Sequence, residues 1–512
     1  MNNQHQEVDF SVNNRFDFII AGSGFAGSIL AMCLVRSGYK VCLIEKKKHP
    51  RFAIGESSTP IADMILRDLA DRYDLPFLKK MSRYGDWQKN YPEIVCGLKR
   101  GFSYFAHQKG KPFESDSMHK HELLVAASMN DENSDTNWLR SDVDHFLVKQ
   151  AVDIGVFYSD ETEISELIRN TETDSWSVKL FRNKKEYNIA SEWIIDGTGS
   201  SHFSEKFFGA KTETDLFHTN SETIYTHLEN VPHWLDDLNH KGFNTDDYPY
   251  HPDHSALHHI IDEGWIWMLR FKNDLLSCGI VVDRNHMKLA EDETSKQIWS
   301  RVVDQYPSLS HLLKNSKMSE LPGRLIRTNR LQRMLDQTAG DGWIALHHTA
   351  GFVDPMHSTG IAFSLSGIEK IAKLFSDEAA PEDRDDLLDL MQDQTKKEIL
   401  FIDQLVSMSY RSRWDFDLFS ASVMIYFVAT VQYEQSRLNG FRPDTFLFAG
   451  DPQISALVRD IHDEIVHLDH DSSKKEIMDY IESIRERIKP LNPAKLLDPE
   501  KHNMYEHTAV KL

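Results

Sequence analysis

Residues 16–27 read FDFIIAGSGFAG, and this stretch decides the fold. Its apolar start, at 16–21, predicts a short buried strand, and residues 28–37 predict a helix that ends at Gly38. A second apolar run, KVCLIE at 40–45, predicts another strand. Strand, glycine-rich turn, helix and strand within about thirty residues form a βαβ unit, which requires a parallel sheet.

The turn between the first strand and the helix has the glycine spacing of a dinucleotide-binding site. Gly22 permits the tight turn, Gly24 lets the backbone approach a pyrophosphate, and Gly27 lets the helix pack on the strand. The helix N-terminus offers free N–H groups to phosphates, and an acid that ends the second strand can bind ribose hydroxyls. The other residues that we expect at this site are Phe25, Ala26 and Glu45. The motif alone does not separate FAD from NAD.

The rest of the chain divides into a β-rich part and a helical part. Residues 221–282 alternate polar and apolar positions, which predicts an antiparallel sheet inserted between nucleotide-binding parts. The chain after Gly360 is predicted to be mostly helical. The expected helices span residues 361–375, 385–410, 420–437, 453–468 and 474–488.

The composition limits the class of protein. The chain has 512 residues, of which 40% are hydrophobic and 11% aromatic, so it supports a large core and is too apolar for a disordered chain. Its formal net charge is −21, from 58 Lys and Arg against 79 Asp and Glu. Because an acidic surface repels phosphate backbones and anionic lipids, we expect no nucleic-acid partner and no membrane adsorption.

Cysteine usage and the polar N-terminus favour the cytoplasm. Cys33, Cys42, Cys96 and Cys278 are scattered and form no metal or redox pair, as in proteins of a reducing compartment. No apolar run approaches the roughly 18 residues of a membrane helix. Residues 1–17 are polar and carry acids, unlike a secretory signal or a transit peptide. We therefore expect a cytoplasmic protein with no membrane span.

Four further segments carry a resemblance to a known family. In chain order they read RFAIGESSTP at 51–60, WLRSDVD at 138–144, IIDGTG at 194–199 and AGFVDPMHSTG at 350–360. In this order and spacing they resemble the FAD-dependent halogenases, tryptophan-halogenase-like members of the flavin monooxygenase superfamily. The resemblance implies that the cofactor is FAD, used as FADH2. The residues that it places beside FAD are Glu56, Ser57, Arg140, Asp196, Gly199, His348, Asp354 and Pro355. His348 stands where many relatives have an aspartate.

A pair of tryptophans is the second part of the resemblance. Trp265 and Trp267 match the Trp-x-Trp element of the family, although Leu269 and Arg270 replace the Ile-Pro that usually follows. In the family the two indoles are thought to keep an organic substrate away from the activated flavin, so that oxygen passes to halide. The alternative is that both side chains lie on one face of a strand as ordinary sheet packing.

A lysine is the third part. The segment GLKRGFSYF at 97–105 is similar to the family segment that carries the directing lysine, with Lys99 in register. The resemblance implies that Lys99 either hydrogen-bonds hypohalous acid and polarises the halogen or forms a haloamine. Burial would lower its pKa and raise its nucleophilicity. The alternative is a surface lysine, which is the usual position for this residue type.

The halide site is expected at the start of the late apolar helix. Ser358, Thr359 and Gly360 supply backbone N–H groups with a helix dipole behind them, and the resemblance gives chloride or bromide to the amides of Thr359 and Gly360. His357 precedes them, where tryptophan-directed relatives have a glutamate. It is a proton acceptor, a hydrogen-bonding partner of the hypohalite or a structural histidine, and its presence argues against tryptophan as the substrate.

A histidine cluster raises the question of a metal. His251, His254, His258 and His259 lie close together in the sequence, but neighbours on a strand point to opposite faces. Since no nearby cysteine or acid pair completes a ligand set, we expect no metal site.

The resemblance implies an α/β fold, α+β overall, with a Rossmann-like FAD-binding domain, an inserted antiparallel β-sheet and a helical C-terminal subdomain. The expected parts are FAD-binding segments at 16–220, a β-rich substrate region with the tryptophans at 221–325, a late FAD and halide segment at 326–375, and a helical cover of the substrate pocket at 376–512.

The expected function is halogenation of a phenol or pyrrole, free or tethered to a carrier protein, by hypohalous acid that Lys99 directs. One alternative is an FAD-dependent monooxygenase or oxidoreductase acting on an aromatic or lipid-like substrate, and another is a flavin-binding protein without turnover. No second dinucleotide-binding turn is found, so we expect a separate NAD(P)H-dependent flavin reductase as partner. The oligomeric state is left open, a homodimer included.

Overall fold

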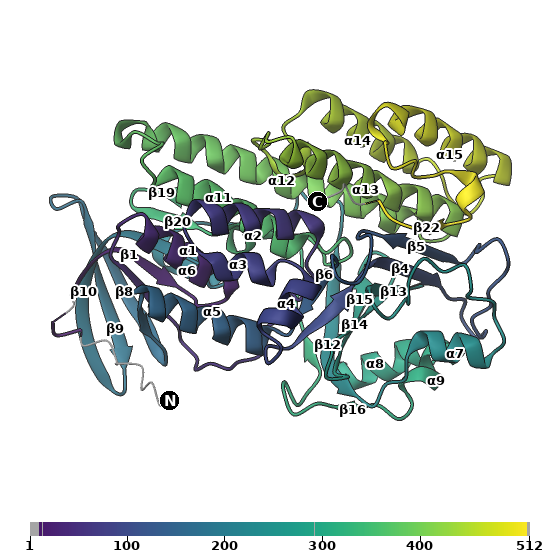
Figure 1. Cartoon of the computed structure of the whole chain (residues 1–512), viewed down its shortest axis with the longest axis horizontal. Coiled ribbons are helices and arrows are strands. Elements are labelled where there is room, and N and C mark those ends of the chain that lie inside the picture. The colour runs from purple at the N-terminus through teal and green to yellow at the C-terminus, as the bar shows by residue number, and fades with distance from the viewer. Residues whose placement is uncertain (1–9, 13, 291, 509–512) are drawn as a thin grey trace.

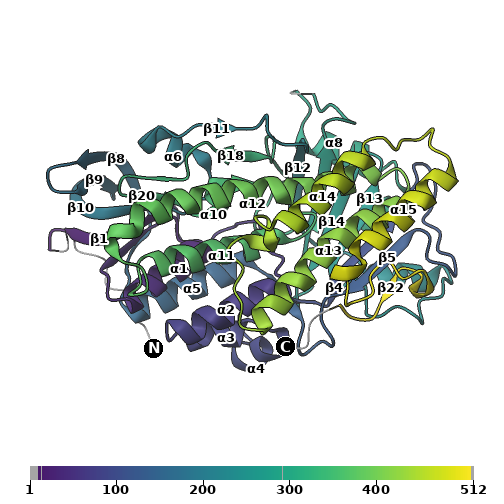
Figure 2. The same cartoon turned by 90° about the horizontal axis from the view of Figure 1, so that it is seen from above.

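The computed structural model describes residues 10–12, 14–290 and 292–508. Two large sheets lie side by side, and the helices of the last third of the chain run along one side of the molecule over both of them (Figures 1 and 2). The polar first residues, in which we expect no targeting signal, lie largely outside the described part.

The first sheet has eight strands and contains the predicted βαβ unit. Its order is β19-β20-β10-β1-β2-β7, with β9 beside β10 and β8 beside β9. Strand β1 pairs in parallel with β2 and with β10, which confirms the parallel sheet. Ala21 lies opposite Asp196, so the turns that follow β1 and β10 meet at one edge of the sheet. The strands are β1 (Arg15–Ala21), β2 (Val41–Ile44), β7 (Phe157–Ser159), β8 (Thr162–Asn170), β9 (Ser175–Arg182), β10 (Lys185–Asp196), β19 (Ala339–Gly340) and β20 (Trp343–Ala345).

The glycine turn joins β1 directly to helix α1 (Phe25–Arg36), which begins three residues earlier than predicted. Gly24 is already the N-cap in an extended conformation, so no further turn residues are needed. Gly22 has φ +102°, and a Cβ atom there would lie 2.4 Å from the carbonyl oxygen of Gly197. A Cβ on Gly27 would lie 2.1 Å from the carbonyl oxygen of Gly22. These two contacts explain why the tight turn and the close helix packing require glycine.

The second sheet has nine strands and is larger than the antiparallel sheet predicted from residues 221–282. Strands β4 and β5 come from inside the 16–220 segment, and β13 runs parallel to β4. Alternation of residue types predicts strands but not their partners, which is why this pairing was missed. At one edge, β22 pairs in parallel with β5. The strands in order are β16 (Lys317–Met318), β12 (Ser221–Glu229), β15 (Leu276–Asp283), β14 (Gly264–Arg270), β13 (Ala256–Ile261), β4 (Gly101–Ala106), β5 (Glu122–Ala126) and β22 (Met504–Tyr505), with β17 (Ile326–Arg327) beside β12.

Two small sheets and several short helices connect these layers. The small sheets pair β3 (Cys96–Lys99) with β6 (Asp135–Trp138), and β18 (Arg333–Leu335) with β11 (Thr212–Glu213) and β21 (Gly351–Phe352). The connecting helices are α2 (Pro60–Arg72), α3 (Pro76–Met81), α4 (Tyr84–Asn90), α5 (Arg140–Ile154), α6 (Ser201–Phe208), α7 (Trp234–His240), α8 (Ser295–Val303), α9 (Pro307–Leu313) and α10 (His347–Ala350).

The five predicted late helices are present with bounds close to those expected. They are α11 (Thr359–Leu374), α12 (Arg384–Ser412), α13 (Phe416–Leu438), α14 (Pro452–Ile465) and α15 (Lys474–Ile488). Helix α12 packs on α13 and α14, and α13 packs on α15 and on α2 (Figure 2).

Helix α13 corrects one sequence expectation. It is long and apolar enough, by length and composition, to cross a membrane, whereas we expected no such run. In the fold, however, 89% of its most apolar 18-residue window is buried. A helix that is apolar on all sides belongs in the core of a large protein, and α13 has that place.

One hydrophobic core joins the parts of the chain. It includes Leu30 of α1, Leu66 of α2, Leu365 of α11 and Val428 of α13, together with Trp265 of the second sheet. The nucleotide-binding segments and the late helices are therefore interleaved in one packing unit, while the four-part division by residue number stays a prediction.

Candidate active site

A cavity of about 930 Å³ lies where the edge of the first sheet meets the second sheet and the start of α11. It brings together most of the residues that the sequence singled out, from segments more than 300 residues apart. The expected residues that line it are Gly22, Gly24, Phe25, Ala26, Glu45, Glu56, Ser57, Arg140, Gly199, Trp265, Trp267, His348, Asp354, Pro355, Ser358, Thr359 and Gly360. Four expected residues, Gly27, Asp196, Lys99 and His357, are not part of the lining.

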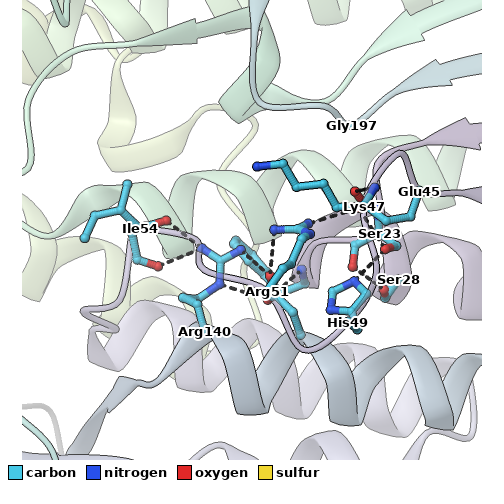
Figure 3. A network of polar contacts seen from close by, with 12 residues as sticks. Ser23, Ser28, Glu45, Lys47, His49, Arg51, Ile54, Arg140 and Gly197 are labelled. Carbon is cyan, nitrogen blue, oxygen red and sulfur yellow. Dashed lines mark hydrogen bonds and ion pairs between the residues drawn. The ribbon is translucent and has the colours of Figure 1, made fainter. Parts of the chain in front are cut away.

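A network of polar contacts surrounds the glycine turn (Figure 3). Glu45 Oε2 accepts hydrogen bonds from the backbone N–H of Ser23 at 3.2 Å and from its hydroxyl at 3.0 Å, and it lies 3.2 Å from Arg51. Burial alone would raise the pKa of Glu45, but Arg51 and the amides of Lys47 and Ser23 hold that pKa below its ordinary value. Glu45 is therefore an ionised carboxylate on the cavity wall, as a ribose-binding acid requires.

Arg51 is a cavity-lining residue that the sequence analysis did not single out, although it begins the RFAIGESSTP segment. Its guanidinium pairs with Glu45 (Figure 3). It also lies 3.8 Å from the Asp144 carboxylate. A Cβ atom on Gly24 would lie 3.7 Å from this guanidinium. A cation is thus held beside the glycine turn, where a pyrophosphate would carry its negative charge.

Arg140 works as a clamp between segments. It donates to both carboxylate oxygens of Asp144, at 2.8 and 2.9 Å, and to the carbonyl oxygens of Ile54 and Gly55, at 2.8 and 3.0 Å. Its guanidinium also lies 4.8 Å from the ring centroid of Phe25. These contacts fix the 51–57 segment against the start of α1, and so they shape the cavity wall.

Asp196 lies behind the cavity wall and holds the turn that follows β10. Its carboxylate is fully buried and accepts hydrogen bonds from the N–H and hydroxyl of Thr198 and from the hydroxyl of Ser204. It thereby holds the turn at Gly197, whose carbonyl oxygen meets Gly22. Gly27 likewise acts through backbone packing.

The far end of the cavity is formed by the turn before α11. Asp354 is buried and accepts hydrogen bonds from the hydroxyl of Tyr410 at 2.7 Å, the hydroxyl of Ser221 at 2.9 Å and the N–H of Met356 at 3.0 Å. Burial raises the pKa of Asp354 to about 6. Burial lowers the pKa of His348 to about 4, so this imidazole is neutral at pH 7 and its Nε2 lies 3.4 Å from the carbonyl oxygen of Gly197.

The two tryptophans project from one face of β14 because they alternate with Ile266. Their ring centroids lie 6.0 Å apart with the planes at 52°. The indole N–H of Trp265 donates to the hydroxyl of Tyr410 at 3.2 Å, and that of Trp267 donates to the hydroxyl of Ser277 at 3.1 Å. Both indoles are thus fixed in orientation as well as packed.

Tyr410 is a second residue that the sequence analysis missed. It lies on α12, about 145 residues after Trp265 and 56 residues after Asp354, and it bonds to both. No sequence pattern signals such a contact, because it depends on the tertiary structure that brings the last turns of α12 to β14. Arg270, which replaces the family proline, points elsewhere and donates to the carbonyl oxygens of Val231 and Pro232.

The start of α11 has the features of an anion site. Ser358 precedes the helix in a left-handed conformation, with φ 51°, and no acidic residue occurs in the first turn. Thr359 is buried and Gly360 is exposed at the cavity wall, where a Cβ would meet no atom within 4 Å. Free N–H groups at a helix N-terminus without a competing carboxylate suit a halide.

Lys99 is buried next to the cavity and not on the surface. Its Nζ donates to the carbonyl oxygen of Ser58 at 2.5 Å and lies 4.0 Å from the ring centroid of Phe102. Burial lowers the pKa of Lys99 to about 8, against the opposing effect of Asp135 and Asp63. Ser57, the neighbour of Ser58, lines the cavity, so the amine is one residue behind the wall.

His357 is also buried outside the lining. Its ring stacks on Tyr426 with centroids 4.4 Å apart and planes at 9°, and its Nε2 lies 3.4 Å from the hydroxyl of Ser409. Burial lowers the pKa of His357 to about 3, so the ring is neutral at pH 7.

The cavity fits a large, polar, phosphate-bearing cofactor such as FAD. At Gly24 a Cβ atom would meet only side-chain atoms, the nearest of them on Arg140 at 3.4 Å, so the bare backbone of this cavity-lining glycine lets a pyrophosphate approach. Several buried polar atoms on its wall have no hydrogen-bond partner within the described part of the chain. They are Arg51 Nε, Glu56 Oε2, Ser57 Oγ and His348 Nδ1. A dinucleotide with hydroxyls and ring nitrogens would supply partners for such atoms.

One group of candidate metal ligands occurs among the described residues. It consists of His233, His251 and Asp253, whose ligand atoms lie within 4.8 Å of one another. Asp253 accepts hydrogen bonds from the first amides of α7, and the guanidinium of Arg270 lies 3.8 Å from it. A cation is therefore already present beside this carboxylate. His258 and His259 are consecutive residues of β13, so they point to opposite faces of this strand.

Comparison with known proteins matches residues 140–419 to the family model described as tryptophan halogenase. The chain belongs to the tryptophan halogenase family. Curated relatives include the monodechloroaminopyrrolnitrin halogenase PrnC of Pseudomonas fluorescens, 28% identical over 82% of this chain and 72% of that protein. The tetracycline 7-halogenase of Kitasatospora aureofaciens is 25% identical over 68% of this chain and 61% of that protein. The family assignment makes the chain an enzyme that uses FAD and halide, as expected.

Solved structures agree with this family at the level of the fold. The crystal structure of halogenase PltM superposes with a TM-score of 0.83, at 24% identity, over 97% of this chain and 99% of that chain. The flavin-dependent brominase Bmp2 superposes with a TM-score of 0.59, at 19% identity, over 93% of this chain and 100% of that chain. The predicted α/β architecture with a Rossmann-like part is confirmed.

Proposed function

We propose that this halogenase-family enzyme chlorinates or brominates an electron-rich arene of the phenol or pyrrole type, with Lys99 directing the halogen. The observation that supports it best is that one cavity is lined by the glycine turn, the indole pair and the start of α11. A cofactor that reaches from Gly24 to Asp354 would have its ring system beside both Trp265 and the expected halide site.

In this proposal, reduced FAD with oxygen supplies the oxidising equivalent that converts halide to hypohalous acid. The amides of Thr359 and Gly360 hold the halide, and the fixed indoles of Trp265 and Trp267 keep the arene away from this end of the cavity. The hypohalous acid is thereby made apart from the carbon that it attacks.

Lys99 then determines where the halogen goes. As an ammonium group it donates a hydrogen bond to the oxygen of hypohalous acid, and as an amine it takes up the halogen and releases water. In either case the arene carbon forms a bond to halogen, the bond from halogen to oxygen or nitrogen breaks, and the ring proton is lost. The lowered pKa of Lys99, about 8, makes both forms accessible near neutral pH.

A buried aromatic cluster beside Lys99 supports a hydroxylated or N–H-bearing arene. Tyr104 stacks on His258 at 4.6 Å and meets the edge of Phe419 at 5.6 Å. Its hydroxyl is buried and has no hydrogen-bond partner among the described residues. His258 lines the cavity with Tyr104 stacked behind it. A phenol hydroxyl or a pyrrole N–H that reached the Tyr104 hydroxyl would supply its missing partner, whereas a plain hydrocarbon ring would not.

The partners follow from this chemistry. A separate NAD(P)H-dependent reductase would deliver FADH2, and the arene would be free or attached to a carrier protein. One relative is a brominase of a pyrrole-2-carbonyl group on a peptidyl-carrier protein, 24% identical over 68% of this chain. We place the reaction in secondary metabolism in the cytoplasm.

The test is a product assay. The enzyme is supplied with a flavin reductase, NADH, FAD, oxygen and either chloride or bromide, together with phenols, pyrroles and indoles, and the products are read by mass spectrometry. We expect chlorinated or brominated phenols or pyrroles, and none when halide is omitted. Products that gain only one oxygen would assign the enzyme to hydroxylation instead, and halogenated indole alone would refute the substrate class.

A further inference from the structure

Three ionisable side chains meet in the interior beside the cavity. Lys99 is fully buried, and Asp135 and Asp63 are each 1% exposed. Lys99 on β3 and Asp135 on β6 are direct cross-strand neighbours. Asp63, in the first turn of α2, faces Asp135 within hydrogen-bonding reach. The proposed function uses the lysine and gives no role to the two acids.

The backbone fixes this arrangement tightly. The carbonyl oxygen of Ser58 accepts the hydrogen bond from Lys99, and Ser58 also exchanges backbone and side-chain hydrogen bonds with Thr136, the neighbour of Asp135. The N–H of Asp63 bonds to the carbonyl oxygen of Thr59. The amine and both acids are therefore attached to one rigid junction of β3, β6 and the start of α2.

The hydrogen bonds and the charges do not balance if both acids are ionised. Neither oxygen of Asp135, nor Oδ2 of Asp63, has a hydrogen-bond partner within the described part of the chain. Two buried carboxylates without donors would be costly, and the Lys99 ammonium is the cation beside Asp135, while the Arg83 guanidinium near Asp63 bonds to Asn133 and donates to neither acid. A proton between the two acids supplies the missing hydrogen bond and leaves one negative charge for one lysine. Burial also raises the pKa of Asp135 to about 6 and that of Asp63 well above its ordinary value.

We propose that Asp63 and Asp135 are positioning residues that share one proton and one negative charge, and that this shared charge sets the protonation of Lys99 and hence the pH range of halogen transfer. The inference rests on the directing role proposed for Lys99. Either acid can carry the charge when the other is neutral, so the pair supplies a counter-charge that loss of one member does not remove.

The other charged and titratable groups around the cluster are few. His258 on β13 faces Lys99, and burial lowers its pKa to about 3, so it is neutral. Arg83 faces Asp63, and Tyr426 on α13 faces Asp135. None of these groups provides a negative charge near neutral pH.

The first test measures kcat/KM for arene halogenation against pH in four enzymes: wild type, Asp63→Asn, Asp135→Asn and the double variant. Removal of an opposite charge near a buried group shifts its pKa by about 1–3 units. We expect the midpoint of the profile to move down by that amount in the double variant and much less in either single variant. Asp71→Asn, an exposed acid on the same helix α2, is the matched control and should leave the profile unchanged. A single variant that shifts the midpoint as far as the double variant would overturn the shared charge.

The second test reads Lys99 without turnover. The protein is labelled with ε-13C lysine, the Lys99 resonance is assigned by its loss in Lys99→Met, and its shift is followed with pH without flavin or arene. We expect the wild-type resonance to titrate well below the usual lysine value of about 10.4, and lower still in the double variant. An ordinary midpoint would overturn the inference even if the variants fail to fold. If the resonance behaves as expected but Lys99→Met still halogenates, the directing role is wrong and the shared charge stands.

Discussion

At its glycine-turn end the cavity is lined by charged side chains that pair with one another, whereas at its indole end it is lined by buried aromatic rings, with an amine sealed behind the wall. Glu45 pairs with Arg51, and Arg140 pairs with Asp144, so each of these side chains faces an opposite charge. Lys99 and His357 are shifted toward their neutral forms because they are fully enclosed. Paired charges suit recognition of a charged cofactor, while desolvation suits groups that must change protonation during a reaction.

The largest effect expected is on the enclosed side. Lys99→Met should lower arene halogenation about 100- to 10,000-fold, or about 3–5 kcal/mol, the range for a positioned proton-transfer group. FAD affinity should stay the same, because Lys99 does not line the cavity. Product formation and flavin fluorescence titration measure the two effects, with Lys89→Met, an exposed residue, as the control. An equal loss of halogenation and of FAD affinity would show that Lys99 also affects the cofactor end of the cavity.

A substitution in the glycine turn should instead lower stability and FAD affinity. Gly22→Ala combines left-handed backbone strain with a Cβ 2.4 Å from the carbonyl oxygen of Gly197, at a cost of about 2–4 kcal/mol in stability. Gly38→Ala is the matched control, since Gly38 has φ +93° but no atom within 4 Å of its Cβ position. Thermal unfolding should show a larger loss of stability in Gly22→Ala than in Gly38→Ala, and FAD titration should show a loss of affinity in Gly22→Ala alone. Equal stability and affinity in the two variants would mean that the contact between residue 22 and the Gly197 carbonyl does not matter.

Asp354, at the junction of the two ends, should give a pH-dependent effect. Its pKa of about 6 in the fold lies above the value of about 3.9 for an unfolded aspartate. Between these two pKa values the folded state holds a proton that the unfolded state has released. The contribution of Asp354 to the free energy of unfolding therefore falls as pH rises. That contribution, roughly 2–3 kcal/mol, is fully present below about pH 4 and lost above about pH 6. The free energy of unfolding of the wild type minus that of Asp354→Asn should therefore decline from pH 4 to pH 6, and a rising difference would contradict the burial of this acid.

The smallest effect concerns the link between the ends. Tyr410→Phe removes the hydrogen bonds to Trp265 and Asp354 and should cost about 1 kcal/mol in stability. It should also raise the fraction of hydroxylated or uncoupled product, because the indole of Trp265 loses its anchor. Tyr480→Phe loses one hydrogen bond to Ile461, away from the cavity, and is the control for stability alone. Identical product distributions in both variants would show that packing suffices to hold the indole.

The features that the sequence predicted correctly are those encoded by contiguous local patterns. The glycine turn is a contiguous motif with a steric reason for each glycine, and the start of α11 follows from an apolar helix after Ser358. The late helices were predicted because their apolar periodicity extends over many turns.

Residues that act through distant partners were not predictable in the same way. Arg51 and Glu45 are close in the sequence. Tyr410, in contrast, contacts Trp265 only because the last turns of α12 lie beside β14. Asp63 faces Asp135 only because α2 begins beside the paired strands β3 and β6. Strands β4 and β5 were overlooked as members of the second sheet for the same reason, since alternation of residue types does not name a partner strand. The resemblance singled out Lys99 and left a surface position as the alternative, whereas its two acidic neighbours depend on strand register and helix placement, which no single-sequence pattern encodes.

The pairing of β22 with β5 has a consequence for synthesis on the ribosome. Strand β5 ends at Ala126 and its partner begins at Met504, so roughly 380 residues are made between them. At 5–20 residues per second this takes about 20–75 seconds, during which the outer edge of β5 has no partner. An uncovered strand edge is a template for pairing with other chains, so we expect recombinant versions truncated before Met504 to aggregate more readily than the full chain.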